Sequence, residues 1–127
     1  MIAAGVGCRR EISADEIEQA VRLALGLYDV APERLEIVAT ESAKATDPAF
    51  PEAARRLPVA LRACTIEELD RVAGRVLTPS LLVLDKKGVP SIAEGSALVA
   101  AGRSSRLLGA RVALGRATCA IAVGDGR

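Results

Sequence analysis

The chain has 127 residues, a formal net charge of +1 and no histidine, and half of its residues are apolar. The missing histidine excludes Ser-His-Asp, Cys-His and histidine–metal chemistry. The balanced charge, with one Phe, one Tyr and no Trp, disfavours a nucleic-acid-binding surface. Cys8, Cys64 and Cys119 form no CxxC pair, so we expect neither a metal site nor a disulfide framework.

The length fits one domain over residues 1–127, with one hydrophobic core. No apolar run reaches the length of a membrane span, and the short run at the N-terminus precedes its arginines rather than following them. We therefore expect a cytoplasmic protein with neither a membrane nor a nucleic acid as partner.

The first third of the chain predicts a strand, a helix and a second strand. Ile2–Val6 is a short apolar run typical of a buried strand, and Gly5-Val6-Gly7 predicts a tight loop at its end. Ser13 and Glu16 have the spacing of a capping box, which predicts a helix start. Leu35–Thr40 alternates as a strand does. The apolar face of the helix comprises Ile17, Ala20, Val21, Ala24 and Leu25.

The middle of the chain predicts a polar loop, a helix, a third strand and another helix. Thr40–Pro48 has the composition of a loop, and Pro51–Leu57 predicts a short helix because Pro favours the first helical position. Val59–Cys64 is the third predicted strand. Thr65–Gly74 begins with a second capping box and predicts a short helix that Gly74 closes in the left-handed conformation.

A third capping box, at Ser91 and Glu94, predicts a helix that ends at Gly102. The Ala and Gly residues of this helix would let it pack close against a sheet. The preceding segment Leu81–Leu84 fits either a strand or one helical turn.

Two late apolar runs, Arg111–Leu114 and Ala117–Val123, flank the pair Gly115-Arg116, which is typical of a type II′ hairpin. The elements together predict an α/β fold: a single three-layer domain whose helices flank a mixed, mostly parallel sheet with an antiparallel C-terminal hairpin.

The first candidate ligand segment is Gly5-Val6-Gly7-Cys8-Arg9-Arg10, at the carboxyl end of a strand, where ligands bind in open α/β sheets. Gly5 and Gly7 would let a ligand approach the backbone, and Arg9 and Arg10 would bind an anion. The segment matches neither a dinucleotide fingerprint nor a P-loop. With no general base nearby, Cys8 fits a packing or contact role better than a nucleophilic one. A glycine turn with solvated arginines is the simpler interpretation.

The second candidate is the loop after the second predicted strand. Thr40 and Ser42 can hydrogen-bond a ligand, and Lys44 can pair with an anion. Glu41 and Asp47 are candidate acid–base groups. The alternative is an ordinary polar connection in which Asp47 leads into the next helix.

The third candidate is the helix start at Ser91 and Glu94. A helix N-terminus carries free N–H groups and partial positive charge, so it suits carboxylates and phosphates. Glu94 is also the third candidate acid or base. A capping box that satisfies itself would explain these residues without any ligand.

Taken in order, these motifs resemble the family formed by CobE and the C-terminal domain of the cobalt-precorrin-5A hydrolase CbiG, in vitamin B12 (cobalamin) biosynthesis. The resemblance covers nearly the whole chain. Two departures are Glu11, where members often have Gly, and Asp47-Pro48, where an acidic residue and Gly are common. The matching segments are Gly5-Val6-Gly7-Cys8-Arg9-Arg10, Thr40 with Lys44, Ser91-Ile92-Ala93-Glu94 with Ala97-Leu98, and Thr118–Ala122.

The resemblance implies work on the corrin ring during its aerobic assembly, with a precorrin or corrinoid tetrapyrrole as ligand and no cofactor. Precorrins are planar rings fringed with carboxylates, which Arg9, Arg10 and Lys44 would bind. Our leading hypothesis is a protein that binds and handles such an intermediate. The alternatives are a small hydrolase or isomerase that uses Glu41, Asp47 or Glu94, and an accessory subunit of a precorrin methyltransferase, with other biosynthetic enzymes as partners.

Overall fold

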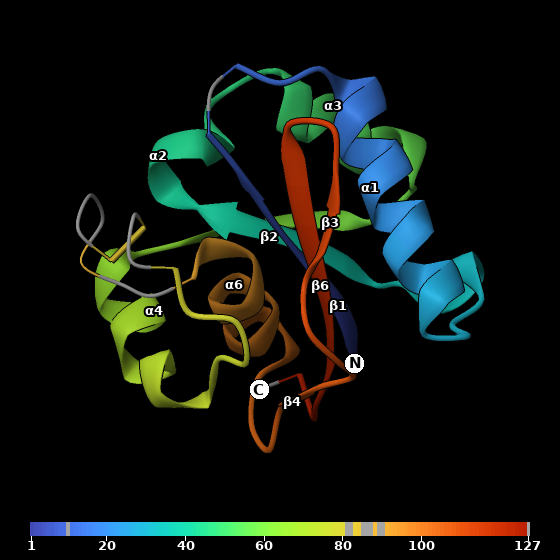
Figure 1. Cartoon of the computed structure of the whole chain (residues 1–127). Helices are drawn as coiled ribbons and strands as arrows, with labels where there is room; N and C mark the ends of the chain where they lie inside the picture. The colour runs from blue at the N-terminus through green and yellow to red at the C-terminus, as the bar shows by residue number, and fades with distance from the viewer. Residues whose placement is uncertain (10, 81–82, 85–87, 89–90, 127) are drawn as a thin grey trace.

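The computed structural model describes residues 1–9, 11–80, 83–84, 88 and 91–126. Strands are followed by helices as far as residue 101, and three strands then end the fold (Figure 1). Residues 81 and 82 of the ambiguous segment lie outside the described residues, whereas Val83 and Leu84 are helical. The strands are β1 (Ile2–Cys8), β2 (Ile37–Glu41), β3 (Ala60–Cys64), β4 (Arg106–Leu107), β5 (Val112–Leu114) and β6 (Ala117–Val123). The helices are α1 (Ala14–Leu27), α2 (Ser42–Ala45), α3 (Ala49–Arg56), α4 (Ile66–Arg71) and α6 (Ile92–Ala101), with 3₁₀ turns η1 (Pro32–Arg34) and η2 (Ala73–Arg75).

The strands form one mixed sheet in the order β3-β2-β1-β6-β4, and β5 also pairs with β6. Strands β1, β2 and β3 are parallel, whereas β6 runs antiparallel to β1, with Cys8 opposite Ala117. The predicted mixed sheet and C-terminal hairpin are confirmed. The carboxyl ends of β1 and β2 therefore lie at the same edge of the sheet as the amino end of β6.

Helices cover both faces of the sheet, as predicted (Figure 1). One core lies between the sheet and α1 and α3, and the other lies between the sheet and α4 and α6. Side chains of β1 alternate between them: Ala4 and Val6 enter the first core, and Ala3 enters the second. Since both faces of β1 are buried, its sequence is apolar throughout. No helix in the described part of the chain is long and apolar enough to cross a membrane.

Two of the three predicted capping boxes close as expected. The hydroxyls of Ser13 and Thr65 each accept a hydrogen bond from the glutamate three residues later, at 3.1 Å, and that glutamate side chain returns to the cap backbone. At the third, the Ser91 hydroxyl accepts from the Glu94 backbone N–H at 3.2 Å. The Glu94 carboxylate instead accepts hydrogen bonds from other segments, so this capping box is half formed.

The structure corrects three predictions around β1 and β2. Strand β1 continues to Cys8, because its antiparallel ladder with β6 outlasts its pairing with β2; Gly5 and Gly7 therefore lie within a strand rather than in a tight loop. Strand β2 begins at Ile37 instead of Leu35 and runs to Glu41. The next residues form the single helical turn α2, where a loop was predicted.

Two helix boundaries also differ from prediction. Helix α3 begins at Ala49 rather than Pro51, because an Asp47 carboxylate oxygen accepts a hydrogen bond from the Ala49 N–H at 3.0 Å and starts the helix earlier. Gly74 lies inside η2 and does not adopt the left-handed conformation; the chain continues as a 3₁₀ turn instead of stopping.

Gly5 brings helix α6 into direct backbone contact with β1. A Cβ atom at Gly5 would lie 2.0 Å from the Ala93 carbonyl oxygen and 2.4 Å from the Ala97 nitrogen. Both are backbone atoms, so no side-chain rotation can make room. The predicted close packing of this helix on the sheet is confirmed, and it depends on glycine at this position.

We expect Gly5→Ala to lower the free energy of unfolding by at least about 2 kcal/mol, because α6 must move off the sheet. Urea denaturation measures this change. The matched control is Gly26→Ala in α1, where a Cβ meets nothing within 4 Å; there we expect a gain of about 0.5–1 kcal/mol. Equal effects of the two substitutions would contradict the proposed contact.

Candidate functional site

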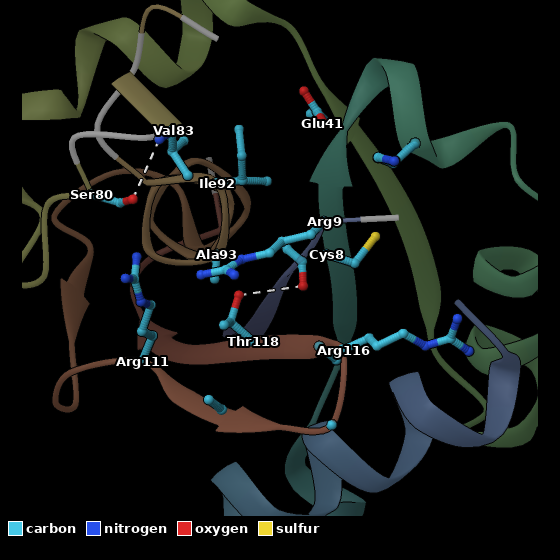
Figure 2. A pocket seen from close by; sticks show the side chains of 15 residues that line it. Cys8, Arg9, Glu41, Ser80, Val83, Ile92, Ala93, Arg111, Arg116 and Thr118 are labelled. Carbon is cyan, nitrogen blue, oxygen red and sulfur yellow. Dashed lines mark hydrogen bonds between the residues drawn. The ribbon is translucent and has the colours of Figure 1, made fainter. Parts of the chain in front are cut away.

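A pocket of about 830 Å³ opens at the sheet edge where β1 and β2 end and β6 begins (Figure 2). Five parts of the chain line it: the end of β1, the β2–α2 junction, Ser80 and Val83 before α6, the start of α6, and the β5–β6 hairpin with the preceding Arg111. The strand directions explain the convergence. Antiparallel pairing of β1 with β6 sets the hairpin turn beside Cys8, and parallel pairing of β1 with β2 sets α2 beside the same end.

Five of the predicted site residues line this pocket: Gly7, Cys8, Arg9, Glu41 and Lys44. The Arg9 side chain crosses the pocket toward the start of α6 at Ala93 (Figure 2). Glu41 is almost fully buried at the end of β2. The two predicted segments after β1 and β2 therefore do meet, and residue 10 lies outside the described residues.

Among the described residues of these segments, four predicted site residues do not line the pocket: Gly5, Thr40, Ser42 and Asp47. Gly5 lies beneath α6. The buried Thr40 hydroxyl donates to the Val6 carbonyl at 2.7 Å, and the Ser42 hydroxyl donates to the Cys64 carbonyl at 2.9 Å. Asp47 caps the start of α3.

Glu94 is fully buried and accepts four hydrogen bonds. Its Oε1 accepts from the backbone N–H groups of Leu77 and Thr78, at 3.0 and 2.8 Å. Its Oε2 accepts from the Thr78 hydroxyl at 2.8 Å and from the Arg111 backbone N–H at 2.9 Å. Neither Glu94 nor Ser91 lines the pocket, although the intervening Ile92 and Ala93 do.

Four polar lining residues escaped the sequence analysis: Ser80, Arg111, Arg116 and Thr118. Arg111 begins the predicted hairpin and Arg116 lies in its turn, so a signal was present in the sequence. The hairpin lies beside β1 because of the strand order, and the sequence pattern does not reveal the strand order. Thr118 lies opposite Gly7 in the ladder, and its hydroxyl donates to the Gly7 carbonyl at 3.3 Å.

The pocket concentrates positive charge. Arg9, Lys44, Arg111 and Arg116 line it, and Glu41 is the acid among the described lining residues. Arg116 extends away toward α1 (Figure 2), where its Nε and Nη2 donate to Glu16 at 2.9 and 2.5 Å.

The remaining three cations are less engaged than Arg116. The Arg111 guanidinium donates to the Thr78 carbonyl at 3.1 Å. Within the described residues, Arg9 and Lys44 have no ion-pair partner. These two side chains are therefore available to an anionic ligand.

The environment of Cys8 disfavours a nucleophilic role. Burial raises the pKa of its thiol; the nearby Lys44 charge opposes this, whereas Asp47, Glu41 and Glu16 reinforce it. The thiol is therefore protonated near neutral pH. In the described part of the chain, no cluster of three or more Cys, Asp or Glu side chains could hold a metal ion.

Small and apolar side chains form the rest of the lining. Ile92 and Ala93 come from α6, Val83 from the segment before it, and Ala113 and Ala117 from the hairpin. An apolar surface bordered by cations can bind a molecule that combines an extended apolar face with peripheral anionic groups.

Comparisons with known proteins agree on one family. Residues 2–122 match the family model described as "Cobalamin synthesis G C-terminus". The protein CobE of Sinorhizobium sp is 36% identical over 118 residues, which cover 93% of this chain and 77% of that protein.

Solved structures give the same result. A crystal structure of CobE, a protein from the cobalamin biosynthetic pathway, superposes with a TM-score of 0.89 at 30% identity and covers 96% of this chain and 89% of its own. The cobalamin biosynthesis protein chiG of Agrobacterium tumefaciens gives 0.78 at 35% identity, with 98% and 99% covered. A putative cobalamin biosynthesis protein G homologue of Sulfolobus solfataricus gives 0.74 at 27% identity; 98% of this chain matches 37% of that one.

The ion pair between Arg116 and Glu16 ties the hairpin to α1 and predicts a pH dependence of stability. Hydrogen bonds from Arg116 and from the Ser13 backbone lower the pKa of Glu16 from 4.5 to about 2. A lowered pKa stabilises the fold above pH 4.5, and this contribution is lost as pH falls toward 2. We expect the difference in unfolding free energy between wild type and Glu16→Gln to shrink over that interval in urea denaturation.

Arg116→Gln provides the control, because the guanidinium is the largest cause of the lowered pKa. In that background the pH-dependent effect of Glu16→Gln should become smaller. A wild-type advantage that stays constant from pH 5 to pH 2 would contradict the role given to this pair.

Proposed function

The chain belongs to the cobalamin synthesis G C-terminal family, and on this premise we propose that it binds a polycarboxylate precorrin or corrinoid ring in the pocket at the end of β1. It is a cobalamin biosynthesis protein related to CobE and CbiG. The observation that carries the proposal is the cationic pocket over an apolar floor, with Arg9 and Lys44 uncommitted within the described residues.

Each part of the lining has a role in this proposal. Arg9 and Lys44 bind peripheral carboxylates of the ring, since charge-assisted hydrogen bonds are stronger than neutral ones. Ile92 and Ala93 pack against the ring face. Gly7 leaves room for the ring edge to approach the floor of the pocket. A Cβ atom at this position would lie 3.0 Å from the Thr118 hydroxyl and 3.5 Å from the Ala93 nitrogen.

Binding and delivery fit this lining better than catalysis, because two of the three candidate acids are engaged elsewhere. Asp47 caps α3, and Glu94 accepts four hydrogen bonds beneath the surface. Glu41 does line the pocket, so it is the residue through which the alternative, a hydrolase or isomerase acting on the same ring, would operate.

Substituting the two cations tests the proposal. We expect Arg9→Ala and Lys44→Ala each to weaken binding of cobyrinic acid, a stable corrin with free acetate and propionate carboxylates, by about tenfold (about 1.4 kcal/mol). Absorbance titration measures the dissociation constants. Arg22→Ala, which removes an exposed α1 arginine paired with Glu18 outside the pocket, should leave them unchanged.

Unchanged binding by the Arg9→Ala/Lys44→Ala double variant would exclude this pocket as the binding site. Anaerobic incubation with precorrin intermediates, followed by mass analysis of the ring, separates the two activities. A stoichiometric spectral shift at constant mass is expected for a carrier. A catalytic change in the mass of the ring that is lost in Glu41→Gln would show that the protein is an enzyme instead. Binding of this protein to a precorrin methyltransferase, with no affinity of its own for the ring, would indicate an accessory subunit.

A further inference from the structure

Glu94 belongs to a buried network that joins three segments of the chain. Its carboxylate, fully buried in α6, accepts from Leu77 and Thr78 on one side and from the Arg111 backbone N–H on the other. The Arg111 guanidinium then donates to the Thr78 carbonyl at 3.1 Å. The helix, the segment before Ser80 and the start of β5 are thus held together by one closed set of hydrogen bonds.

The network stands directly behind the pocket wall. Ile92 and Ala93, the residues just before Glu94, line the pocket, as do Arg111 and Ser80. Glu94 itself does not line it. The carboxylate is therefore hydrogen-bonded to a lining residue, Arg111, although it lies outside the lining itself.

A glutamine side chain cannot satisfy this arrangement. Three of the four partners are backbone N–H groups, which can only donate, and they contact both oxygens, so both oxygens must accept. A glutamine has the same shape but replaces one oxygen with an NH₂ group, which would face donors. Among the described residues this buried carboxylate has hydrogen bonds but no ion pair, and burying a charge without an ion pair is costly. Its place beneath a cationic pocket points to a positioning role.

We propose that Glu94 is a positioning residue for the ligand site: it fixes the Arg111 wall and the segment ending at Ser80 against the start of α6, so that Arg111 presents its charge to the ligand. This inference rests on the proposed ring-binding function and deepens it. It assigns a specific indirect role to a residue that the sequence marked as a direct ligand or acid–base group. The remaining donor groups of the Arg111 guanidinium are then oriented toward the pocket before the ligand arrives.

Titration of cobyrinic acid into wild type, Glu94→Gln, Arg111→Gln and the double variant tests the coupling. We expect Glu94→Gln to raise the dissociation constant at least tenfold while the binding stoichiometry stays unchanged. Its affinity should also depend less on salt than that of wild type, as in Arg111→Gln, because one ligand-facing cation is displaced. The double variant should bind no more weakly than the weaker single variant, since both remove the same contact.

Two further variants separate positioning from folding. Glu68→Gln is the matched control, because Glu68 also accepts from a helix-cap backbone N–H, at 3.0 Å from Thr65, but lies outside the pocket lining; its affinity should equal that of wild type. Thr78→Val removes the hydroxyl donor and keeps the charge. It should raise the dissociation constant severalfold, and it decides the question if Glu94→Gln does not fold.

The outcomes distinguish this inference from the function on which it rests. If the wild type binds the ring and Glu94→Gln binds it with the same dissociation constant, the positioning role is overturned and ring binding stands. If Glu94→Gln lowers the binding stoichiometry at constant affinity, Glu94 serves folding alone and the positioning role is overturned. The role is also overturned if the effects of the two substitutions on the dissociation constant multiply in the double variant. Absence of binding by the wild type overturns both.

Discussion

The backbone contact between α6 and β1 at Gly5 determines where the pocket floor lies. Because no side chain separates them, the helix lies against the strand, and its first residues come to the strand's carboxyl end. Ile92 and Ala93 therefore form the floor beside Gly7 rather than a second layer above it. A conventional spacing with side chains between the elements would raise this floor by several ångströms and separate the helix start from Arg9.

The mixed direction of the strands supplies the walls. A parallel neighbour places the β2–α2 junction, with Glu41 and Lys44, at the end of β1. An antiparallel neighbour places a two-residue turn there as well, and Gly115 alone of that pair has a positive φ, which suits the tight turn predicted for it. Since both kinds of pairing occur on β1, side chains separated by about a hundred residues in sequence line one pocket.

Local signals in the sequence predicted most elements but only part of the site. Capping boxes at Ser13 and Thr65 fixed two helix starts, because their interactions lie within four residues. The box at Ser91 failed in part, because donors from residues 77, 78 and 111 compete for the Glu94 carboxylate, and no local pattern shows them. Arg111 and Arg116 were missed for the same reason: their relation to β1 depends on strand order, which sequence periodicity does not contain.

Charge pairing explains how a chain with a net charge of +1 has a strongly cationic pocket. Acids elsewhere are matched by arginines: Glu18 pairs with Arg22, Glu52 with Arg56, and Glu68 with Arg62. Glu94 is withdrawn into the interior, where backbone and hydroxyl donors satisfy it. Arg9 and Lys44 are left without such partners in the described part of the chain. Cations that are not neutralised within the protein favour an anionic ligand, and the engagement of Asp47 and Glu94 in structure leaves Glu41 as the acid among the described lining residues.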